Sequence, residues 1–402
     1  MKTMKHLTVI LLVVFVGTIS LALVGCDQEN EVKIAVAGPF TGSVAAFGEM
    51  IKRGAELKAK EINAAGGVKI NTAEGVISKP LKLIFEDDTG KDKEAGHVAT
   101  KIATNRQILA VIGHFNSSCS LAGKPIYKQY EIVQLSPGST NVRVCKGSDW
   151  TFRNLYHDGF QGRFIAKYIK DVLTDVQSVA VFFDNDDYGR GLRDTFTQAA
   201  EKIGLEIVAS EAYDRDNTDF KAQLTSIKGK NPDMIFISGL YAQASLIVSQ
   251  AREAGITVPF FGADGVDSPD FLKNAGPAAE GTYITTPFAF ESGTPEADKV
   301  YQAFEKEYGK APDTWAALTY DALGMIVEAI EKVGENRKAI RDYLAAIDKP
   351  EKGYAGITGL TYFDENGDCV KPAYVKQVKN GKFAAAEKQM KDPEVIASLL
   401  RE

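Results

Sequence analysis

The stretch Leu109-Ala-Val-Ile-Gly113-His114-Phe115-Asn116-Ser117-Ser118-Cys119-Ser120 decides how this chain folds. The apolar run 108–112 predicts a buried strand, and the small hydroxyl residues after it lead into a helix expected over 121–130. Pro125 fits that helix only near its first turn, because an interior proline removes a hydrogen bond. A helix start rich in serine presents N–H groups and hydroxyls to an anion such as a carboxylate. For the serine pair alone, a simple N-cap is the plainer interpretation.

Length and composition indicate a soluble two-domain protein. The chain has 402 residues, of which 45% are hydrophobic and 25% are charged, as in ordinary globular proteins. The formal net charge is −6 and no basic patch stands out, so nucleic acid and anionic lipid surfaces are not expected partners. No cofactor is expected either.

The N-terminus predicts export. Two lysines precede an apolar run over 7–23, and small residues then stand before Cys26. This arrangement resembles a bacterial lipobox, which implies a signal peptide over 1–25, lipid attachment to Cys26 and a polar tether over 26–31. The alternative is a membrane-spanning anchor, but the run is slightly shorter than the ~20 residues that a span needs. Asp27 resembles the inner-membrane retention signal of Gram-negative lipoproteins, so the expected location is extracytoplasmic and membrane-tethered, on the periplasmic face in such a host.

Three cysteines remain in the mature chain: Cys119, Cys145 and Cys369. At most one pair can form, and at least one thiol stays free. None of them has the spacing of metal ligands, so no metal site is expected.

Beyond the tether, apolar runs alternate with amphipathic segments in two series, which predicts two α/β domains with parallel sheets. The first series has expected strands at 32–36, 81–85, 108–112 and 132–135, with helices at 49–63, 91–105 and 121–130. The pattern breaks at 151–159 and restarts with strands at 179–183, 206–209, 234–237 and 259–262, and helices at 162–172, 191–203, 220–228 and 242–254.

The C-terminal part follows a different pattern. Three successive helices are expected at 296–308, 314–333 and 338–347, and without strands between them they must pack on an existing sheet. A terminal hairpin is expected from 360–363 and 373–379, because an Asn-Gly step at 366–367 is a strong turn signal.

The loops after the expected strands carry the candidate binding residues, since open α/β sheets bind ligands beyond the carboxyl ends of their strands. Ser117, Ser118 and Thr140 can hold an anion, and Asp264 can pair with a cation. Apolar walls are expected from Phe47, Tyr188 and Tyr241. Together these groups complement a zwitterion that carries a side chain.

Enzyme signatures are missing from the sequence. It contains no Gly-x-Ser-x-Gly, Walker loop, His-Glu-x-x-His or Cys–His pairing, so we expect binding and not catalysis. The acidic segment 184–189 briefly suggests a calcium loop, but Tyr188 and Thr195 stand where that loop needs carboxylates.

At family level, the chain resembles the leucine/isoleucine/valine-binding proteins, the solute receptors of branched-chain amino acid ABC transporters. In the first half the matching motifs are Lys33-Ile-Ala-Val36, Gly38-Pro-Phe-Thr-Gly42, Phe47-Gly48, Glu61-Ile-Asn63-Ala-Ala-Gly66-Gly67, Glu86-Asp87-Asp88, Val111-Ile-Gly113-His114 and Ser117-Ser118. In the second half they are Asp187-Tyr188-Gly189-Arg-Gly191-Leu192, Gln250-Ala-Arg252-Glu-Ala254-Gly255 and Gly262-Ala-Asp264-Gly265.

The resemblance implies a periplasmic-binding-protein-like fold of type I, with two α/β lobes and three crossovers. Lobe 1 would comprise 32–155 plus 287–360, lobe 2 would comprise 156–286 plus 361–386, and a tail would follow over 387–402. The C-terminal helices would return to lobe 1 and the hairpin would cross to lobe 2.

The resemblance also implies roles for single residues. Ser117, Ser118 and Thr140 would hold the ligand carboxylate, while the backbone carbonyl of Gly138 and the side chain of Asp264 would take its ammonium group. Phe47 and Tyr188 match aromatic positions of the side-chain pocket, and Asp158 falls on an acidic hinge position.

The chain departs from the family at several positions. The leucine-binding proteins carry Glu where Asp264 stands, and Leu240 falls where they have Tyr, with Tyr241 shifted by one. Their cysteine pair in lobe 1 is absent. These changes affect the side-chain pocket, and so the choice of ligand.

The expected function is that of an ABC importer's receptor, monomeric and lipid-anchored, which closes on a branched-chain or other apolar amino acid and presents the closed form to a permease. A receptor for an amide, urea or an aromatic acid is an alternative, as is a sensor that serves no transporter. An extracytoplasmic hydrolase is the alternative with least support.

Overall fold

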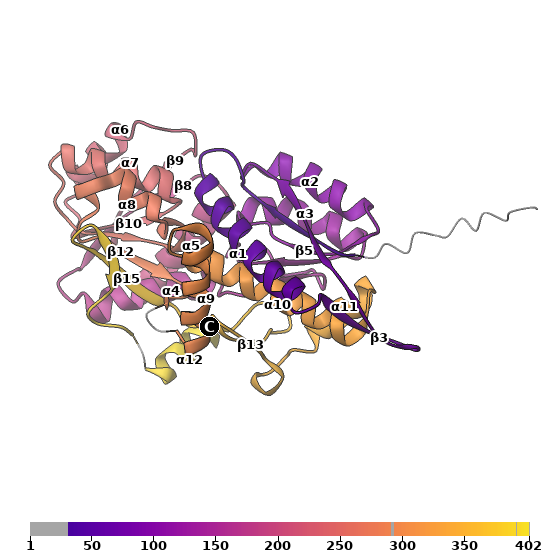
Figure 1. Ribbon diagram of the computed structural model, residues 1–402. Coiled ribbons are helices and arrows are strands. Elements are labelled where there is room, and N and C mark those ends of the chain that lie inside the picture. Colours follow the sequence, from indigo (N-terminus) through magenta and orange to yellow (C-terminus); the bar gives the residue numbers. More distant parts are fainter. Residues whose placement is uncertain (1–30, 291–292, 391, 402) are drawn as a thin grey trace, which may run out of the picture. The chain divides into compact units, whose positions relative to one another are not determined.

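The computed structural model describes residues 31–290, 293–390 and 392–401 (Figure 1). The predicted signal peptide, the lipidation residue Cys26 and the tether up to residue 30 lie outside the described residues. Within the described ranges, no helix is both long and apolar enough to cross a membrane.

The first lobe is built on a five-stranded parallel sheet in the order β4-β1-β5-β6-β7. All five residues of β5 are buried, as an apolar run covered on both faces requires. The strands are β1 (Val32–Gly38), β4 (Leu81–Asp87), β5 (Ile108–Ile112), β6 (Val133–Ser136) and β7 (Thr151–Arg153). The helices that connect them are α1 (Ala45–Ala64), α2 (Asp92–Thr104) and α3 (Ser117–Gln129). A hairpin of β2 (Val68–Thr72) and β3 (Gly75–Lys79) follows α1.

The second lobe is built on a seven-stranded sheet in the order β16-β15-β12-β11-β10-β8-β9. Its strands are β8 (Ser178–Asp184), β9 (Glu206–Tyr213), β10 (Met234–Ser238), β11 (Phe260–Gly262), β12 (Tyr283–Thr286), β15 (Tyr374–Lys379) and β16 (Lys382–Ala385). The first five run parallel, and the last two are antiparallel to their neighbours. The helices are α4 (Asp158–Val172), α5 (Asp187–Lys202), α6 (Lys221–Gly229), α7 (Tyr241–Glu253), α8 (Pro269–Ala275) and the C-terminal α12 (Pro393–Arg401).

Three C-terminal helices follow β12, as the sequence predicts: α9 (Pro295–Tyr308), α10 (Thr314–Val333) and α11 (Arg337–Ala345). Helix α10 is buried along most of its length and packs against α1, so it completes the core of the first lobe. Figure 1 shows the orange α10 beside the indigo α1, from opposite ends of the chain. A short β13 (Tyr354–Gly356) and β14 (Gly359–Thr361) pair follows α11. The chain thus leaves the first lobe after β7, returns to it after β12 when α10 packs against α1, and re-enters the second sheet at β15. The residue boundaries of the lobes stay a prediction.

The prediction that 360–363 pairs with 373–379 in a terminal hairpin is wrong. Strand β15 pairs with β12 on one side and with β16 on the other, and its tight turn is Asn380-Gly381, both with positive φ. The turn at Asn366-Gly367 instead closes an isolated bridge between Phe363 and Cys369. Both Asn-Gly dipeptides favour the same tight turn. Only the one at Asn380-Gly381 joins two strands of a sheet, because β15 pairs with the open edge of β12 and β16 then follows it.

Two further expectations concern Pro125 and the three cysteines. Helix α3 begins at Ser117, four residues earlier than predicted, so Pro125 lies in its interior and not in its first turn. Cys119, Cys145 and Cys369 are all buried free thiols, so none of the possible disulfides has formed among them.

Candidate functional site

Helix α3 starts where β5 ends, at the carboxyl edge of the first sheet. The first N–H groups of a helix have no partner within it, so the N–H groups at Ser117 and Ser118 can donate to a ligand. The Ser117 hydroxyl accepts a hydrogen bond from the backbone N–H of Asn141 at 3.2 Å, which leaves its own proton available. Thr140 is buried outside the cavity lining, and its hydroxyl faces the Asp158 carboxyl group, whose pKa it lowers. Ser117 therefore offers a hydroxyl donor on one side of the site, and Thr140 lies beside Asn141, whose N–H holds that hydroxyl.

A buried network holds the loop that precedes α3. His114 Nδ1 lies 2.6 Å from Asp88 Oδ2, and His114 Nε2 lies 2.9 Å from the Tyr127 hydroxyl. The backbone carbonyl of His114 accepts hydrogen bonds from the hydroxyls of Ser120, Ser136 and Ser139 at 3.2, 2.7 and 3.2 Å. Ser120 lies in α3, whereas Ser136, at the end of β6, and Ser139 lie on either side of Gly138. The His114 carbonyl is therefore hydrogen-bonded to both segments that carry the predicted anion-binding residues.

Asp264 lies across from these donors, in the second lobe. It opens the short 3-10 helix Asp264–Val266 directly after β11. Its Oδ1 accepts a hydrogen bond from the Tyr188 hydroxyl at 2.6 Å, while its Oδ2 is buried without a partner among the described residues. Burial raises the pKa of Asp264 to about 6, and the hydrogen bond from Tyr188 opposes that rise. A desolvated carboxylate with one free oxygen is suited to a cationic group.

Asp158 adds a second buried carboxylate at the predicted hinge. It begins α4, and its backbone N–H donates to the Thr140 carbonyl at 2.7 Å. The Thr140 hydroxyl acts on this carboxyl group as a hydrogen-bond donor, and it lowers the pKa of Asp158. The pKa of Asp158 is raised well above its ordinary value, chiefly by burial and next by the negative charge of Asp264. The two acidic groups therefore reinforce each other's preference for a positive neighbour.

A small cavity separates the two lobes at this place. Four predicted residues line it, namely Ser117, Gly138, Tyr188 and Asp264. Its other lining residues are Phe115, Asn116, Leu240, Gly265 and Trp315. The cavity measures only about 10 Å³, roughly the room for one water molecule. A larger ligand can therefore enter only if the lobes move apart.

The remaining predicted residues lie around this cavity without lining it. Phe47 is buried with its ring centroid 4.4 Å from that of Phe115 and 4.9 Å from that of Tyr241, so it supports the wall from behind. The Tyr241 hydroxyl donates to the carbonyl of Ser43 in the first lobe at 3.3 Å. The Ser118 hydroxyl donates to Asp186 Oδ2 of the second lobe at 3.2 Å. Tyr241 and Ser118 thus join the two lobes.

Sequence reasoning missed five lining residues as site residues. Phe115 and Asn116 lie inside the stretch 109–120, and their place directly before Ser117 is the available signal. The ring of Phe115 fills the space beside Gly138, where an added Cβ would lie 2.2 Å from it. Leu240 and Gly265 are direct neighbours of predicted residues. Trp315 arrives from α10, and no local pattern indicates its role.

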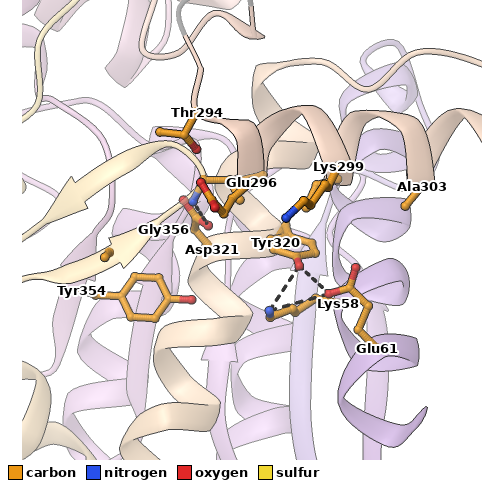
Figure 2. Close-up of a pocket in the computed structure, with 13 residues that line it drawn as sticks. Lys58, Glu61, Thr294, Glu296, Lys299, Ala303, Tyr320, Asp321, Tyr354 and Gly356 are labelled. Carbon is orange, nitrogen blue, oxygen red and sulfur yellow. Dashed lines mark hydrogen bonds and ion pairs between the residues drawn. The ribbon is translucent and has the colours of Figure 1, made fainter. Parts of the chain in front are cut away.

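A larger cavity, of about 690 Å³, lies elsewhere in the first lobe, between α1, α9, α10 and β13 (Figure 2). Lys58 Nζ lies 3.2 Å from the Tyr320 hydroxyl and 3.8 Å from Glu61, and that hydroxyl donates to Glu61. Asp321 accepts hydrogen bonds from the backbone N–H groups of Ile357 and Thr358. These polar groups are already paired with one another, and none of the predicted binding residues lines this cavity. The candidate site is therefore the small cavity between the lobes.

Comparison with known proteins identifies the family of this chain. A family model described as periplasmic binding protein matches residues 31–382. An amino acid binding protein of Pseudomonas aeruginosa is 33% identical over 347 residues, which cover 86% of this chain and 89% of that protein. Among solved structures, a leucine-binding protein LivK from Thermotoga maritima has a TM-score of 0.82 at 31% identity, over 90% of this chain and 99% of that one. The branched-chain amino acid receptor LivJ from Streptococcus pneumoniae, in complex with isoleucine, has a TM-score of 0.81 at 32% identity, over 89% and 99% of the two chains.

The family match covers nearly all of the described chain, and these solved relatives share its two-lobe fold along almost their full length. The chain therefore belongs to the periplasmic binding protein family, whose members are extracytoplasmic solute-binding receptors of ABC transporters.

Proposed function

We propose that this chain is the substrate-binding receptor of an amino-acid importer and closes its lobes on a branched-chain or other apolar α-amino acid. The observation that carries this proposal is the pairing of opposite chemistries across one cavity. Ser117, at the N-terminus of α3 in the first lobe, lines the same cavity as Asp264 of the second lobe, whose buried Oδ2 has no partner among the described residues. Such a site complements a molecule with a carboxylate at one end and an ammonium group at the other.

The roles of the predicted residues follow from this arrangement. Ser117 and Thr140 would bind the ligand carboxylate, together with the backbone N–H groups of α3. Asp264 would bind the ammonium group, with the Gly138 carbonyl as a second acceptor and Asp158 as a nearby negative charge. The apolar walls from Phe115, Leu240 and Trp315 would enclose the side chain. Two of the relatives support the same assignment, since one is named for binding leucine and the other was solved with isoleucine.

The two buried carboxylates favour an amino acid over an amide, urea or an aromatic acid. A ligand without a cationic group would leave the ionised carboxylate of Asp264 desolvated and uncompensated, at a cost of several kcal/mol unless it becomes protonated. An amino acid provides the missing positive charge and avoids that cost. The binding groups identified here hold a ligand without attacking it, so we propose a receptor and not an enzyme.

The cellular arrangement follows from the N-terminal sequence. We infer that cleavage before Cys26 and lipidation of its thiol tether a monomeric receptor to the outer face of the cytoplasmic membrane, where the closed form meets the permease subunits. The lipobox-like sequence before Cys26 supports this inference. A sensor that serves no transporter would have the same binding site and is distinguished by its partner.

A thermal-shift screen of the mature protein tests the proposed function. The panel contains the twenty L-amino acids, simple amides without an amino group, urea and small aromatic acids. We expect the largest rise in Tm with an apolar amino acid such as isoleucine or leucine, because a ligand that binds only the folded state stabilises it. Stabilisation by amides or aromatic acids alone would contradict the proposal.

Ligand affinity should depend on pH through Asp264. Its pKa is raised to about 6 in the ligand-free protein, whereas an ammonium ligand stabilises the ionised form, so binding below pH 6 must release a proton. Affinity is therefore complete above about pH 6 and falls as the pH drops further. We expect a Kd for L-isoleucine about tenfold larger at pH 5 than at pH 7 by calorimetry. Equal Kd values at the two pH values would remove Asp264 from the ammonium site.

A further inference from the structure

A cluster of polar contacts joins the two lobes outside the ligand cavity. We call it the rim latch, formed by Gly90 and Ser118 of the first lobe and by Asp184, Asp186 and Arg215 of the second. Arg215 Nη1 donates to the Gly90 carbonyl at 3.1 Å, and the Ser118 hydroxyl donates to Asp186 Oδ2 at 3.2 Å. None of these five residues lines the small cavity.

Arg215 is held in place from its own side. Its Nε donates to Asp184 Oδ2 at 3.0 Å, and its Nη2 pairs with Asp186. The Arg215 side chain is only 18% exposed and that of Asp184 only 2%, so these charges are largely shielded from water. Asp186 is fixed as well, because its Oδ1 caps α5 by accepting from the Gly189 N–H at 2.8 Å. The planar guanidinium therefore points its remaining N–H group at the first lobe without further ordering.

The partner on the first lobe is equally fixed. Asp88 Oδ1 accepts a hydrogen bond from the Gly90 N–H at 2.9 Å, and the other oxygen of Asp88 lies 2.6 Å from His114 Nδ1. His114 is the residue whose carbonyl ties together the two anion-binding loops. The latch and the binding loops thus share one rigid support.

A second contact lies beside the latch. Asn141 Nδ2 donates to the backbone carbonyl of Asp187 across the lobes at 2.6 Å. This approach requires a glycine in α5, because a Cβ on Gly191 would lie 2.3 Å from Asn141 Nδ2. Any side chain at position 191 would push the amide of Asn141 away from Asp187, and neither Gly191 nor Asn141 lines the cavity.

We propose that the rim latch stabilises the closed form independently of the ligand, and that Arg215 raises affinity by slowing release without touching the bound molecule. The latch residues join the two lobes without lining the cavity, so their contribution to closure does not require contact with the ligand. A charge-assisted bond from a preorganised donor favours closure by its own free energy. The same contact gives the Ser118 hydroxyl a partner in Asp186, while the N–H groups of the α3 N-terminus remain available to the ligand. The effect on affinity rests on the proposed function, whereas the effect on closure does not.

The first test compares Arg215→Lys with Arg252→Lys. Lysine keeps the charge but cannot bridge Asp184, Asp186 and Gly90 at once. Arg252 is the matched control, because it donates to the carbonyls of Ile256 and Val258 within the second lobe alone. Stopped-flow binding of L-isoleucine should show about tenfold faster release for Arg215→Lys with association changed less than about threefold. Arg252→Lys should alter only Tm, and equal release rates in wild type and Arg215→Lys would overturn the proposal.

The second test uses Gly191→Ala and needs no ligand. Alanine is more favourable than glycine inside a helix, so this variant should match or exceed the wild type in Tm. Spin labels on cysteines placed at the exposed positions Lys60 and Glu201, one in each lobe, report the closed population by electron paramagnetic resonance. We expect that population to fall in Arg215→Lys, which breaks the latch, and in Gly191→Ala, which displaces the adjacent contact between Asn141 and Asp187. An unchanged population in Arg215→Lys would refute the latch, whereas failure of wild type to bind any amino acid would refute only the proposed function.

Discussion

Replacing Asp264 with asparagine should abolish useful amino-acid binding while leaving the ligand-free protein at least as stable as the wild type. The carboxylate is the cationic partner in the proposed site, and truncating one member of a buried charge pair costs about 2–5 kcal/mol of binding free energy. We therefore expect Kd to rise by more than tenfold, and Asp264→Ala should have an effect at least as large.

The free energy of unfolding should rise in Asp264→Asn, because the buried charge of Asp264 destabilises the fold without ligand. Its pKa, raised to about 6 by burial, lies above the ordinary value of 3.8. The stabilising contribution of the protonated form is therefore complete below about pH 4 and is lost as the pH rises through 6. At pH 7 the ionised group destabilises the fold by about 3 kcal/mol, of which a neutral asparagine removes a large part.

Calorimetry with L-isoleucine and thermal unfolding without ligand measure the two effects separately. Asp270→Asn, in the first turn of the nearby α8, is the control and should change neither quantity appreciably. Unchanged affinity in Asp264→Asn would remove this residue from the site. A fall in Tm together with lost binding would indicate a structural role in place of a ligand contact.

The double variant Ser117→Ala with Thr140→Ala should lose recognition of the ligand carboxylate. Each hydroxyl is a potential donor to a charged oxygen, and such hydrogen bonds contribute about 1.5–3 kcal/mol when shielded from water. Loss of both should weaken binding of L-leucine by on the order of 100-fold or more. The N–H groups at the start of α3 remain, so residual binding is expected at high ligand concentration.

Selectivity distinguishes this effect from general damage. Wild type should strongly prefer L-leucine over L-leucinamide, which lacks the carboxylate, and the double variant should lose most of that preference. The single variant Thr140→Ser keeps a hydroxyl at this position and should retain much of the wild-type affinity for L-leucine. If the double variant keeps the full preference for L-leucine, the carboxylate is bound elsewhere.

Local patterns predict the framework of the site well. The run 108–112 is β5, buried on both faces, and the serines after it begin α3. Asp264 follows β11 at the carboxyl edge of the second sheet, as the strand pattern indicates. These predictions succeed because the burial of a strand and the start of a helix depend mainly on residues close in the sequence.

Predictions fail or remain incomplete where partners are distant in the sequence. Trp315 lines the cavity only because α10 returns to the first lobe and packs beside α1. The sequence pattern predicts the terminal hairpin at Asn366-Gly367, but the hairpin turns at Asn380-Gly381. Only the open edge of β12, far away in the sequence, identifies the partner of β15. Pro125 lies inside α3 because the helix starts earlier than its apolar pattern indicates.

The sequence by itself determined two α/β lobes, an exported chain and a set of polar loops at the strand ends, since periodicity and turn residues act over a few positions. Only the tertiary structure decided which loops meet. It places Ser117 and Asp264 on one cavity, turns the Ser118 hydroxyl toward Asp186 and brings Arg215 to the carbonyl of Gly90. These contacts join residues that are 147, 68 and 125 positions apart, and they exist only when the lobes come together, so no local pattern encodes them.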